Sequence, residues 1–123
     1  MKILVTDDSK MARKMVIKTL TEILQDNVEI HEAQNGQEAL ELYKQLLPNI
    51  VFLDLTMPVL DGFGALEKIK EFDKNAKVVI ISADIQKLSM DKAQQLGAFN
   101  FVKKPIDESK MQQILDKISN LDN

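Results

Sequence analysis

The sequence of 123 residues contains no cysteine and no tryptophan, and it has a single histidine, His31. Without cysteine, the chain can form no disulfide and offers no thiolate to a metal ion, which fits a reducing compartment. No apolar run approaches the length of a signal-peptide core or of a membrane-spanning helix. We therefore expect a cytoplasmic protein in which any metal site is built from oxygen ligands.

The chain also has fewer basic than acidic residues, with 16 Lys and Arg and 19 Asp and Glu. Such a chain lacks the basic face that nucleic-acid binding requires. It also contains neither a Gly-x-Gly-x-x-Gly motif nor a P-loop, so nucleotide binding is disfavoured. The expected partners are proteins and a cation attracted to clustered acids, with no nucleic acid and no membrane. The length predicts one domain over 1–123, and we expect a monomer.

Short apolar runs alternate with segments of helical period along the chain. We expect strands at 2–6, 28–33, 50–54, 77–82 and 99–103, and helices at 9–25, from 35 onward, at 62–72, at 86–96 and from 107 onward. Five strands that alternate with five helices imply a parallel sheet with helices on both faces. The economical fold is the flavodoxin-like (βα)5 sandwich with strand order 2-1-3-4-5. That order places the polar-alternating segment 28–33 at an edge.

Local signals mark several helix ends. Asn35 followed by Glu38 resembles a capping box, and Asp107 is a good N-cap for the last helix. Gly97 is placed to end the fourth helix as its C′ residue. The apolar stripe of the second helix is expected to run to Leu47.

Acidic, basic or hydroxyl side chains follow four of the five expected strands where each strand ends. They are Asp7 and Asp8 after the first strand, Asp54 at the end of the third, Ser82 at the end of the fourth, and Lys103 and Lys104, followed by Pro105, after the fifth. Only the neutral Gln34 and Asn35 follow the second strand. Ligands of open α/β sheets bind outside the carboxyl ends of the strands, so these groups should converge on one pocket.

Three carboxylates in one pocket repel one another, by about 4 kcal/mol for a pair at 4 Å and an effective dielectric near 20. Such a cluster either raises a pKa or recruits a cation. Oxygen ligands favour Mg²⁺, for which Mn²⁺ or Ca²⁺ could substitute. A lysine and a hydroxyl facing that cation would cradle a phosphoryl group. Asp54, on the central strand, is the best-placed nucleophile for an aspartyl phosphate.

Each of these groups also has a simpler interpretation when taken alone. Asp7 and Asp8 precede a helix, where acids often only complement the helix dipole. Ser82 can be a local cap at a strand end, and Lys104 can be an ordinary solvated lysine. The joint pattern carries the prediction, because the groups lie at the ends of different strands of one sheet.

The motifs that carry a resemblance are Asp7-Asp8, Asp54-x-x-Met57-Pro58-x-x-Asp61-Gly62, Ser82-Ala83 and Lys104-Pro105. Together they resemble the receiver domain of two-component response regulators, and most closely the stand-alone, CheY-like chemotaxis regulators. The resemblance extends over the whole chain and includes the spacing of the strands.

The resemblance implies a role for each matching position. Asp54 would be the phospho-acceptor. Asp8, Asp54 and the Thr56 carbonyl would bind Mg²⁺ directly, and Asp7 would act through water. Lys104 would pair with the phosphoryl group, whereas Lys103 is disfavoured because it does not directly precede the proline. The peptide bond between Lys104 and Pro105 would be cis. Ser82 and Phe101 would form the switch, and Thr56 and Asp84 would tune dephosphorylation. The serine at 82 and the phenylalanine at 101 depart from the more frequent threonine and tyrosine.

The function implied is a phosphorylation-activated signalling switch that catalyses only its own phosphorylation and dephosphorylation. A histidine kinase would donate the phosphoryl group. A downstream protein, such as the flagellar motor switch of chemotaxis, would bind the face made by the fourth helix, fifth strand and fifth helix. The alternatives are a single-domain phosphorelay intermediate, an adaptor, or a receiver fragment of a larger response regulator.

Two further classes remain open. A haloacid-dehalogenase-like phosphatase also uses an aspartyl phosphate, but it carries its nucleophile after the first strand as Asp-x-Asp, whereas Asp54 follows the third. A pseudo-receiver that only binds proteins would not need the clustered acids.

Overall fold

Ten regular elements alternate strictly between strand and helix in the computed structural model, which describes residues 1–83 and 85–121. The strands are β1 (Lys2–Thr6), β2 (Glu29–Ala33), β3 (Ile50–Asp54), β4 (Val78–Ser82) and β5 (Asn100–Lys103). The helices are α1 (Lys10–Leu24), α2 (Gly36–Leu46), α3 (Gly62–Phe72), α4 (Lys87–Gln95) and α5 (Glu108–Leu121). Each bound that was predicted lies within one residue of its expected position.

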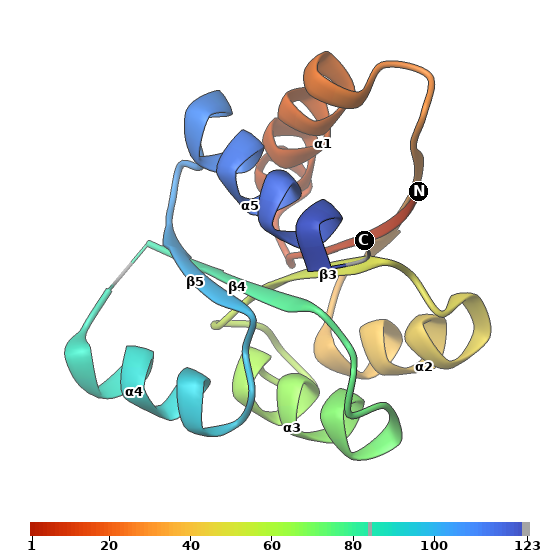
Figure 1. Ribbon diagram of the computed structural model, residues 1–123. Helices are drawn as coiled ribbons and strands as arrows, with labels where there is room; N and C mark the ends of the chain where they lie inside the picture. Colours follow the sequence, from red (N-terminus) through yellow and green to blue (C-terminus); the bar gives the residue numbers. More distant parts are fainter. Residues whose placement is uncertain (84, 122–123) are drawn as a thin grey trace.

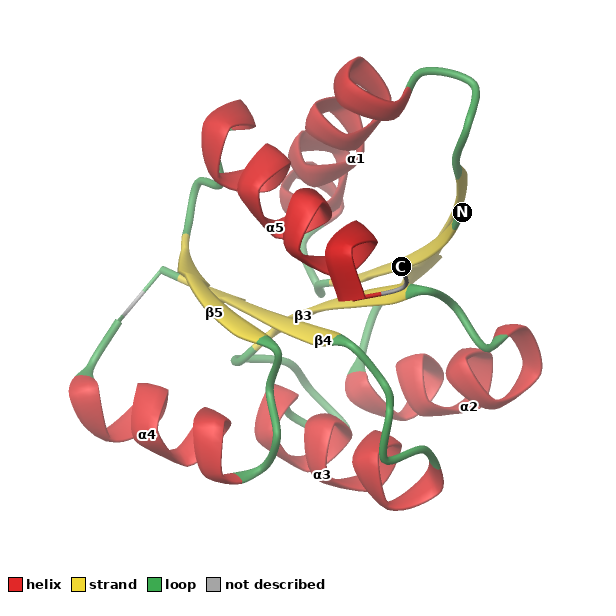
Figure 2. Cartoon of the chain, viewed as in Figure 1, coloured by secondary structure: helices red, strands yellow, loops and turns green. Residues whose placement is uncertain are grey.

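The five strands form one parallel sheet in the order β2-β1-β3-β4-β5, which confirms the predicted flavodoxin-like order. Helices α1 and α5 cover one face of the sheet, and α2, α3 and α4 cover the other (Figures 1 and 2). Each face has its own apolar core. Every residue of β3 and β4 is buried, as expected for the central strands of a sheet covered on both faces.

Strand β2 lies at the edge of the sheet, as its polar alternation predicted. It pairs only with β1 among the described strands, and most of its side chains are exposed or half-buried. The His31 side chain is half-buried, at 34% exposed, and its Nε2 lies 2.8 Å from the Glu29 carboxylate. That hydrogen bond lowers the pKa of Glu29.

The predicted helix caps are present. The Asn35 side chain accepts a hydrogen bond from the Glu38 N–H, and the Asp107 side chain accepts one from the Lys110 N–H. Gly97 follows α4 with a φ of 94°, the left-handed conformation that favours glycine. These features agree with the sequence because each depends on residues only three or four positions apart.

The expected burial of Leu47 is wrong. Its side chain is 60% exposed, because α2 ends at Leu46 and Leu47 is a C-cap with a left-handed backbone. A residue in that conformation leaves the helical path, so it no longer continues the apolar stripe.

The turn between β3 and α3 is packed tightly against the rest of the fold. The Gly62 N–H donates to the Leu55 carbonyl, and the Gly36 N–H donates to the Leu60 carbonyl. A Cβ atom at Gly62 would overlap the Asp54 carbonyl oxygen, and one at Gly36 would overlap that of Leu60. The Asp61-Gly62 motif therefore fixes the path of the chain immediately after Asp54.

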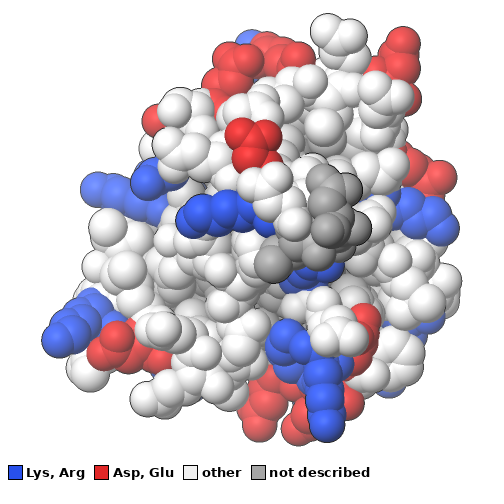
Figure 3. Space-filling view, viewed as in Figure 1, with Lys and Arg blue, Asp and Glu red and all other residues white. Residues whose placement is uncertain are grey.

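Among the described residues, none of the helices combines the length and the apolar character needed to cross a membrane. Figure 3 shows basic and acidic side chains interspersed on the face drawn, which agrees with a formal net charge of only −3.

Candidate functional site

The ends of β1 and β3 bring three carboxylates together. Asp7 and Asp8 directly follow β1, and Asp54 is the last residue of the neighbouring strand β3. Each of the three offers a carboxylate oxygen, and these oxygens lie within 4.8 Å of one another. The sheet order predicted from the sequence is what joins them.

Lys104 reaches this acidic cluster from the loop after β5. Its Nζ lies 2.6 Å from Asp7 Oδ2 and 3.2 Å from Asp54 Oδ1. The following peptide bond, to Pro105, is cis. Lys103 is exposed and makes no ion pair among the described residues, so Lys104 is the lysine of the site.

Burial sets the electrostatics of the site. Asp7 and Asp54 are only 5% and 8% exposed, whereas Asp8 faces solvent. Burial raises the pKa of Asp54, and the charge of Asp7 adds to this rise, while Lys104 opposes it. Burial lowers the pKa of Lys104, but its contacts with Asp7 and Asp54 outweigh this effect and raise the pKa overall. The ammonium therefore stays charged and offsets part of the carboxylate charge.

The donor set fits a hard divalent cation. It consists of carboxylate oxygens, two buried and one exposed, and within the described part of the chain only the Lys104 ammonium is in direct contact with these carboxylates. Mg²⁺ binds through one or two carboxylates and keeps several waters, so an exposed Asp8 suits it. Asp8 and Asp54 would hold the ion directly, with the Thr56 carbonyl, and Asp7 would act through water.

Ser82 and Thr56 lie beside the cluster at the ends of β4 and β3. The Ser82 side chain is buried, whereas Thr56 is exposed. Both line a hollow of about 410 Å³, whose other lining residues are Leu55, Met57, Asp61, Phe63 and Ser89. The hollow thus runs from the two hydroxyls toward α3 and α4. Asp84, the other residue expected to tune dephosphorylation, lies outside the described residues.

Phe101 is half-buried on β5 and packs against the apolar core on the α2, α3 and α4 face of the sheet. It also lines a hollow of about 300 Å³ together with Met90, Asp91, Ala93 and Gln94 of α4. The ring therefore lies between the sheet and α4, on the face expected to bind a downstream protein.

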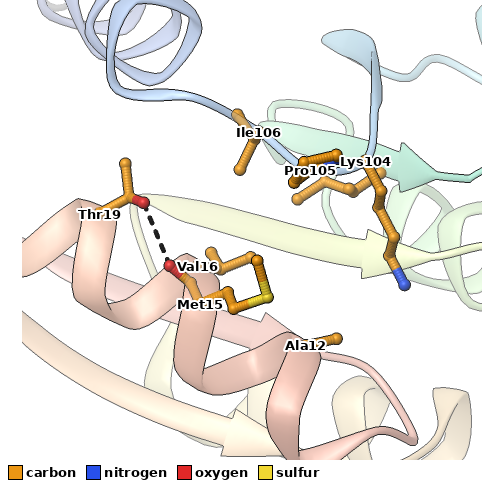
Figure 4. A pocket seen from close by; sticks show the side chains of 8 residues that line it. Ala12, Met15, Val16, Thr19, Lys104, Pro105 and Ile106 are labelled. Atoms are coloured by element: carbon orange, nitrogen blue, oxygen red, sulfur yellow. Dashed lines mark hydrogen bonds between the residues drawn. The ribbon is translucent and has the colours of Figure 1, made fainter.

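A separate apolar hollow of about 110 Å³ lies between α1 and the loop after β5, and its residues are shown in Figure 4. Met15 and Val16 line it from α1, and Pro105 and Ile106 line it from the loop. The Lys104 ammonium points away from these apolar side chains in Figure 4. The aliphatic part of this lysine therefore packs in the hollow, and its ammonium group contacts the acidic cluster.

Two residues near the site were not expected from the sequence. Arg13 of α1 is buried and donates from Nη1 to the Asp7 carbonyl at 2.7 Å, and from Nε to Glu32 Oε1 at 2.9 Å. Glu32 belongs to β2, the strand expected to add nothing to the site. One signal was available: Arg13 is a cation in the first turn of a helix, where the helix dipole disfavours positive charge. It also lies on the buried side of that helix, three residues before Val16.

Comparisons with known proteins agree with this geometry. The family model of the response regulator receiver domain matches residues 3–116. The chain is 42% identical to the chemotaxis protein CheY of Treponema pallidum, over 98% of this chain and 81% of that protein. It is 37% identical to the chemotaxis protein CheY of Thermotoga maritima, over 96% of this chain and 97% of that protein.

The fold also matches solved structures. A chain of the CheX–CheY–BeF3–Mg²⁺ complex from Borrelia burgdorferi superposes with a TM-score of 0.87 at 35% identity, covering 96% of this chain and 88% of that chain. The family match spans nearly all of the sheet and helices that position the acidic cluster. The chain therefore belongs to the response regulator receiver domains and is similar to the chemotaxis protein CheY.

Proposed function

We propose that this receiver domain is a phosphorylation-activated switch of a two-component system and that Asp54 is the residue that accepts the phosphoryl group. The observation that carries the proposal is the position of the Asp54 carboxylate. It is buried at the end of the central strand, 3.2 Å from the Lys104 ammonium and within 4.8 Å of two further carboxylates. As a receiver domain, the chain is a signalling protein, and its catalysis concerns its own phosphorylation and dephosphorylation.

In the proposed reaction, an Asp54 carboxylate oxygen attacks the phosphorus of a phosphohistidine on a histidine kinase. An O–P bond forms, the P–N bond breaks, and the imidazole leaves with the electron pair. Mg²⁺, when bound, neutralises the charge of the phosphoryl oxygens. Lys104 pairs with the transferred group, and Asp7 holds the lysine in position through its 2.6 Å contact. We place this exchange in the cytoplasm, because a chain without cysteine suits a reducing compartment.

After the transfer the side chain of Asp54 carries roughly two negative charges in place of the single charge of the carboxylate, and the switch follows from that change. Ser82 hydrogen-bonds a phosphoryl oxygen, and Phe101 moves into the space that Ser82 leaves. The face formed by α4, β5 and α5 then binds a downstream protein. A bias of a few kcal/mol inverts the populations of the two states. Thr56, which lines the hollow beside the cluster, and Asp84 tune the rate of dephosphorylation.

The acceptor is tested by labelling with acetyl phosphate and Mg²⁺, read by intact-protein mass spectrometry. We expect Asp54→Asn to reduce the added phosphoryl mass to background. Asp26→Asn, a matched change at an exposed aspartate, should label like the wild type. Labelling that persists in Asp54→Asn would refute the acceptor assignment.

For the output, we propose the flagellar motor switch of chemotaxis, because the similar proteins named above are CheY proteins. Beryllofluoride, a phosphoryl mimic, should make the protein capture a motor-switch protein that is not captured without it. Capture of a histidine phosphotransfer protein or of another enzyme instead would favour a phosphorelay intermediate or an adaptor.

A further inference from the structure

Arg13 is the only arginine in the sequence, and it is buried. Burial of a guanidinium is costly unless its donors are paired, and arginine suits such positions because its planar fork can bind two acceptors at once. Here the guanidinium has two acceptors from different parts of the chain. One is the main-chain carbonyl of Asp7 after β1, and the other is the Glu32 carboxylate of β2.

The carbonyl that Arg13 binds belongs to the peptide between Asp7 and Asp8. The other side of Asp7 is also fixed, because its N–H donates to the Ala33 carbonyl at 3.2 Å and its Oδ1 accepts from the Ser9 N–H at 2.9 Å. Asp8 differs, since among the described residues no side chain bonds its exposed carboxylate. The direction of the Asp8 side chain therefore depends on the orientation of the peptide that Arg13 holds.

Glu32 orients the guanidinium from the edge of the sheet. The Arg13 side chain is 8% exposed and the Glu32 side chain is 47% exposed, so the acidic partner of this pair lies toward solvent and the guanidinium is buried. Partners that orient a metal ligand without touching the metal commonly change metal affinity by about 10–100-fold when they are removed.

We propose that Arg13, oriented by Glu32, is a positioning residue that holds the Asp7–Asp8 peptide and thereby strengthens divalent-cation binding by the acidic cluster. This inference rests on the proposed function of the cluster. It predicts a change in cation affinity opposite in sign to the change expected from charge alone. Removal of a positive charge beside three carboxylates should tighten cation binding on charge alone, whereas loss of positioning should weaken it.

The test is titration of Mg²⁺ into the unphosphorylated full chain by isothermal titration calorimetry. We expect Arg13→Met to raise the Mg²⁺ dissociation constant about 10–100-fold. Arg13→Lys should fall between this variant and the wild type, because an ammonium retains the charge but not the fork. Lys14→Met removes a charge from the neighbouring exposed position of α1, and it should bind Mg²⁺ as tightly as the wild type or slightly more tightly.

A second readout separates positioning from general damage to the fold. In acetyl phosphate labelling, Arg13→Met should need more Mg²⁺ for half-maximal rate but should recover the wild-type rate at saturating Mg²⁺. Glu32→Gln, at a half-exposed side chain, should keep the fold and shift the half-maximal Mg²⁺ concentration in the same direction. This variant decides the question if Arg13→Met does not fold.

Equal or tighter Mg²⁺ binding by folded Arg13→Met and Glu32→Gln would overturn the positioning role while leaving the proposed function intact. A wild-type chain that neither binds Mg²⁺ nor accepts label at Asp54 would overturn both.

Discussion

The hydroxyl of Thr6 is the one buried side-chain polar atom among the described residues that has no hydrogen-bond partner. Thr6 ends β1, pairs in register with Ala33 and Leu53, and is only 2% exposed. Its backbone continues the hydrogen-bond ladder of the sheet, but its hydroxyl loses hydration and gains no hydrogen bond within the protein. A buried polar group in this condition costs about 1–3 kcal/mol.

Thr6→Val should therefore stabilise the protein. Valine has nearly the same shape as threonine and removes the unpaired hydroxyl, so the free energy of unfolding should rise by about 1–2 kcal/mol. Urea unfolding followed by circular dichroism measures the change. Thr21→Val is the control, because the Thr21 hydroxyl is exposed and already donates to the Ile17 carbonyl. Its effect should stay within about 0.5 kcal/mol. A loss of stability in Thr6→Val would show that the hydroxyl has a partner.

At the residue scale, the sequence identified the acidic residues but not the way in which they are held. Asp7, Asp8 and Asp54 could be named because each follows a predicted strand. The contact between Arg13 and the Asp7 carbonyl could not be named, since it depends on where α1 sits above the end of β1. A helix docks through many side chains at once, and no local pattern encodes that position.

At the scale of elements, α4 is the helix with the weakest attachment. Ala93 is its only buried residue, and Leu88 and Met90 are 82% and 40% exposed. Its N-cap, Gln86, makes no side-chain capping bond. The Lys92 ammonium lies 4.5 Å from the centre of the Phe63 ring, which ties α4 to α3. Few buried contacts give an element a low free energy of local opening.

Amide hydrogens of α4 should consequently exchange faster than those of α5, which buries Met111, Ile114, Leu115 and Ile118. Gln86→Asp should slow exchange in α4, because an aspartate at the N-cap accepts a hydrogen bond from the Ser89 N–H and is worth about 1 kcal/mol. Hydrogen exchange read by mass spectrometry reports both effects. The matched change Gln95→Asp places the same charge at the other end of α4 and should give no protection. Equal protection of α4 and α5 in the wild type would contradict this view of the helix.

At the scale of the whole molecule, a hydrogen bond joins α2 to the segment that follows α3. The Tyr43 hydroxyl donates to Asp73 Oδ2 at 2.7 Å, and the Tyr43 ring meets Phe72 edge-on with centroids 6.2 Å apart. The bond from Tyr43 lowers the pKa of Asp73, and the Asn75 N–H adds to the effect. Burial raises the pKa of the Tyr43 phenol, and Asp73 raises it further.

These two shifts predict a stability contribution with a plateau in pH. A lowered carboxyl pKa gives stability that is present above the ordinary pKa, near 4, and is lost as the pH falls through the lowered value. A raised phenol pKa gives stability that is present below the ordinary value, near 10, and is lost as the pH rises toward the raised one. Tyr43→Phe should therefore cost about 1 kcal/mol near pH 7, and less at both acidic and alkaline pH.

Urea unfolding of the wild type and Tyr43→Phe between pH 3 and pH 11 measures this profile, with the range set by the ordinary pKa values of about 4 and 10. Asp73→Asn keeps an acceptor for the phenol but removes the titrating carboxyl. In this background the cost of Tyr43→Phe should therefore no longer decrease at acidic pH. A cost of Tyr43→Phe that does not vary with pH would assign the role of Tyr43 to packing alone.

The sequence by itself determined the order of the elements, their caps and the burial of β3. These features depend on residues within a few positions, such as Asn35 with Glu38, and on apolar runs that only a covered sheet can bury. Tertiary structure decided the exposure of Leu47, the reach of Lys104 to both Asp7 and Asp54, and the attachment of Arg13 and Glu32 to the site. Each of these depends on how separate elements pack in three dimensions, because contacts between residues far apart in the chain form only when the helices settle on the twisted sheet.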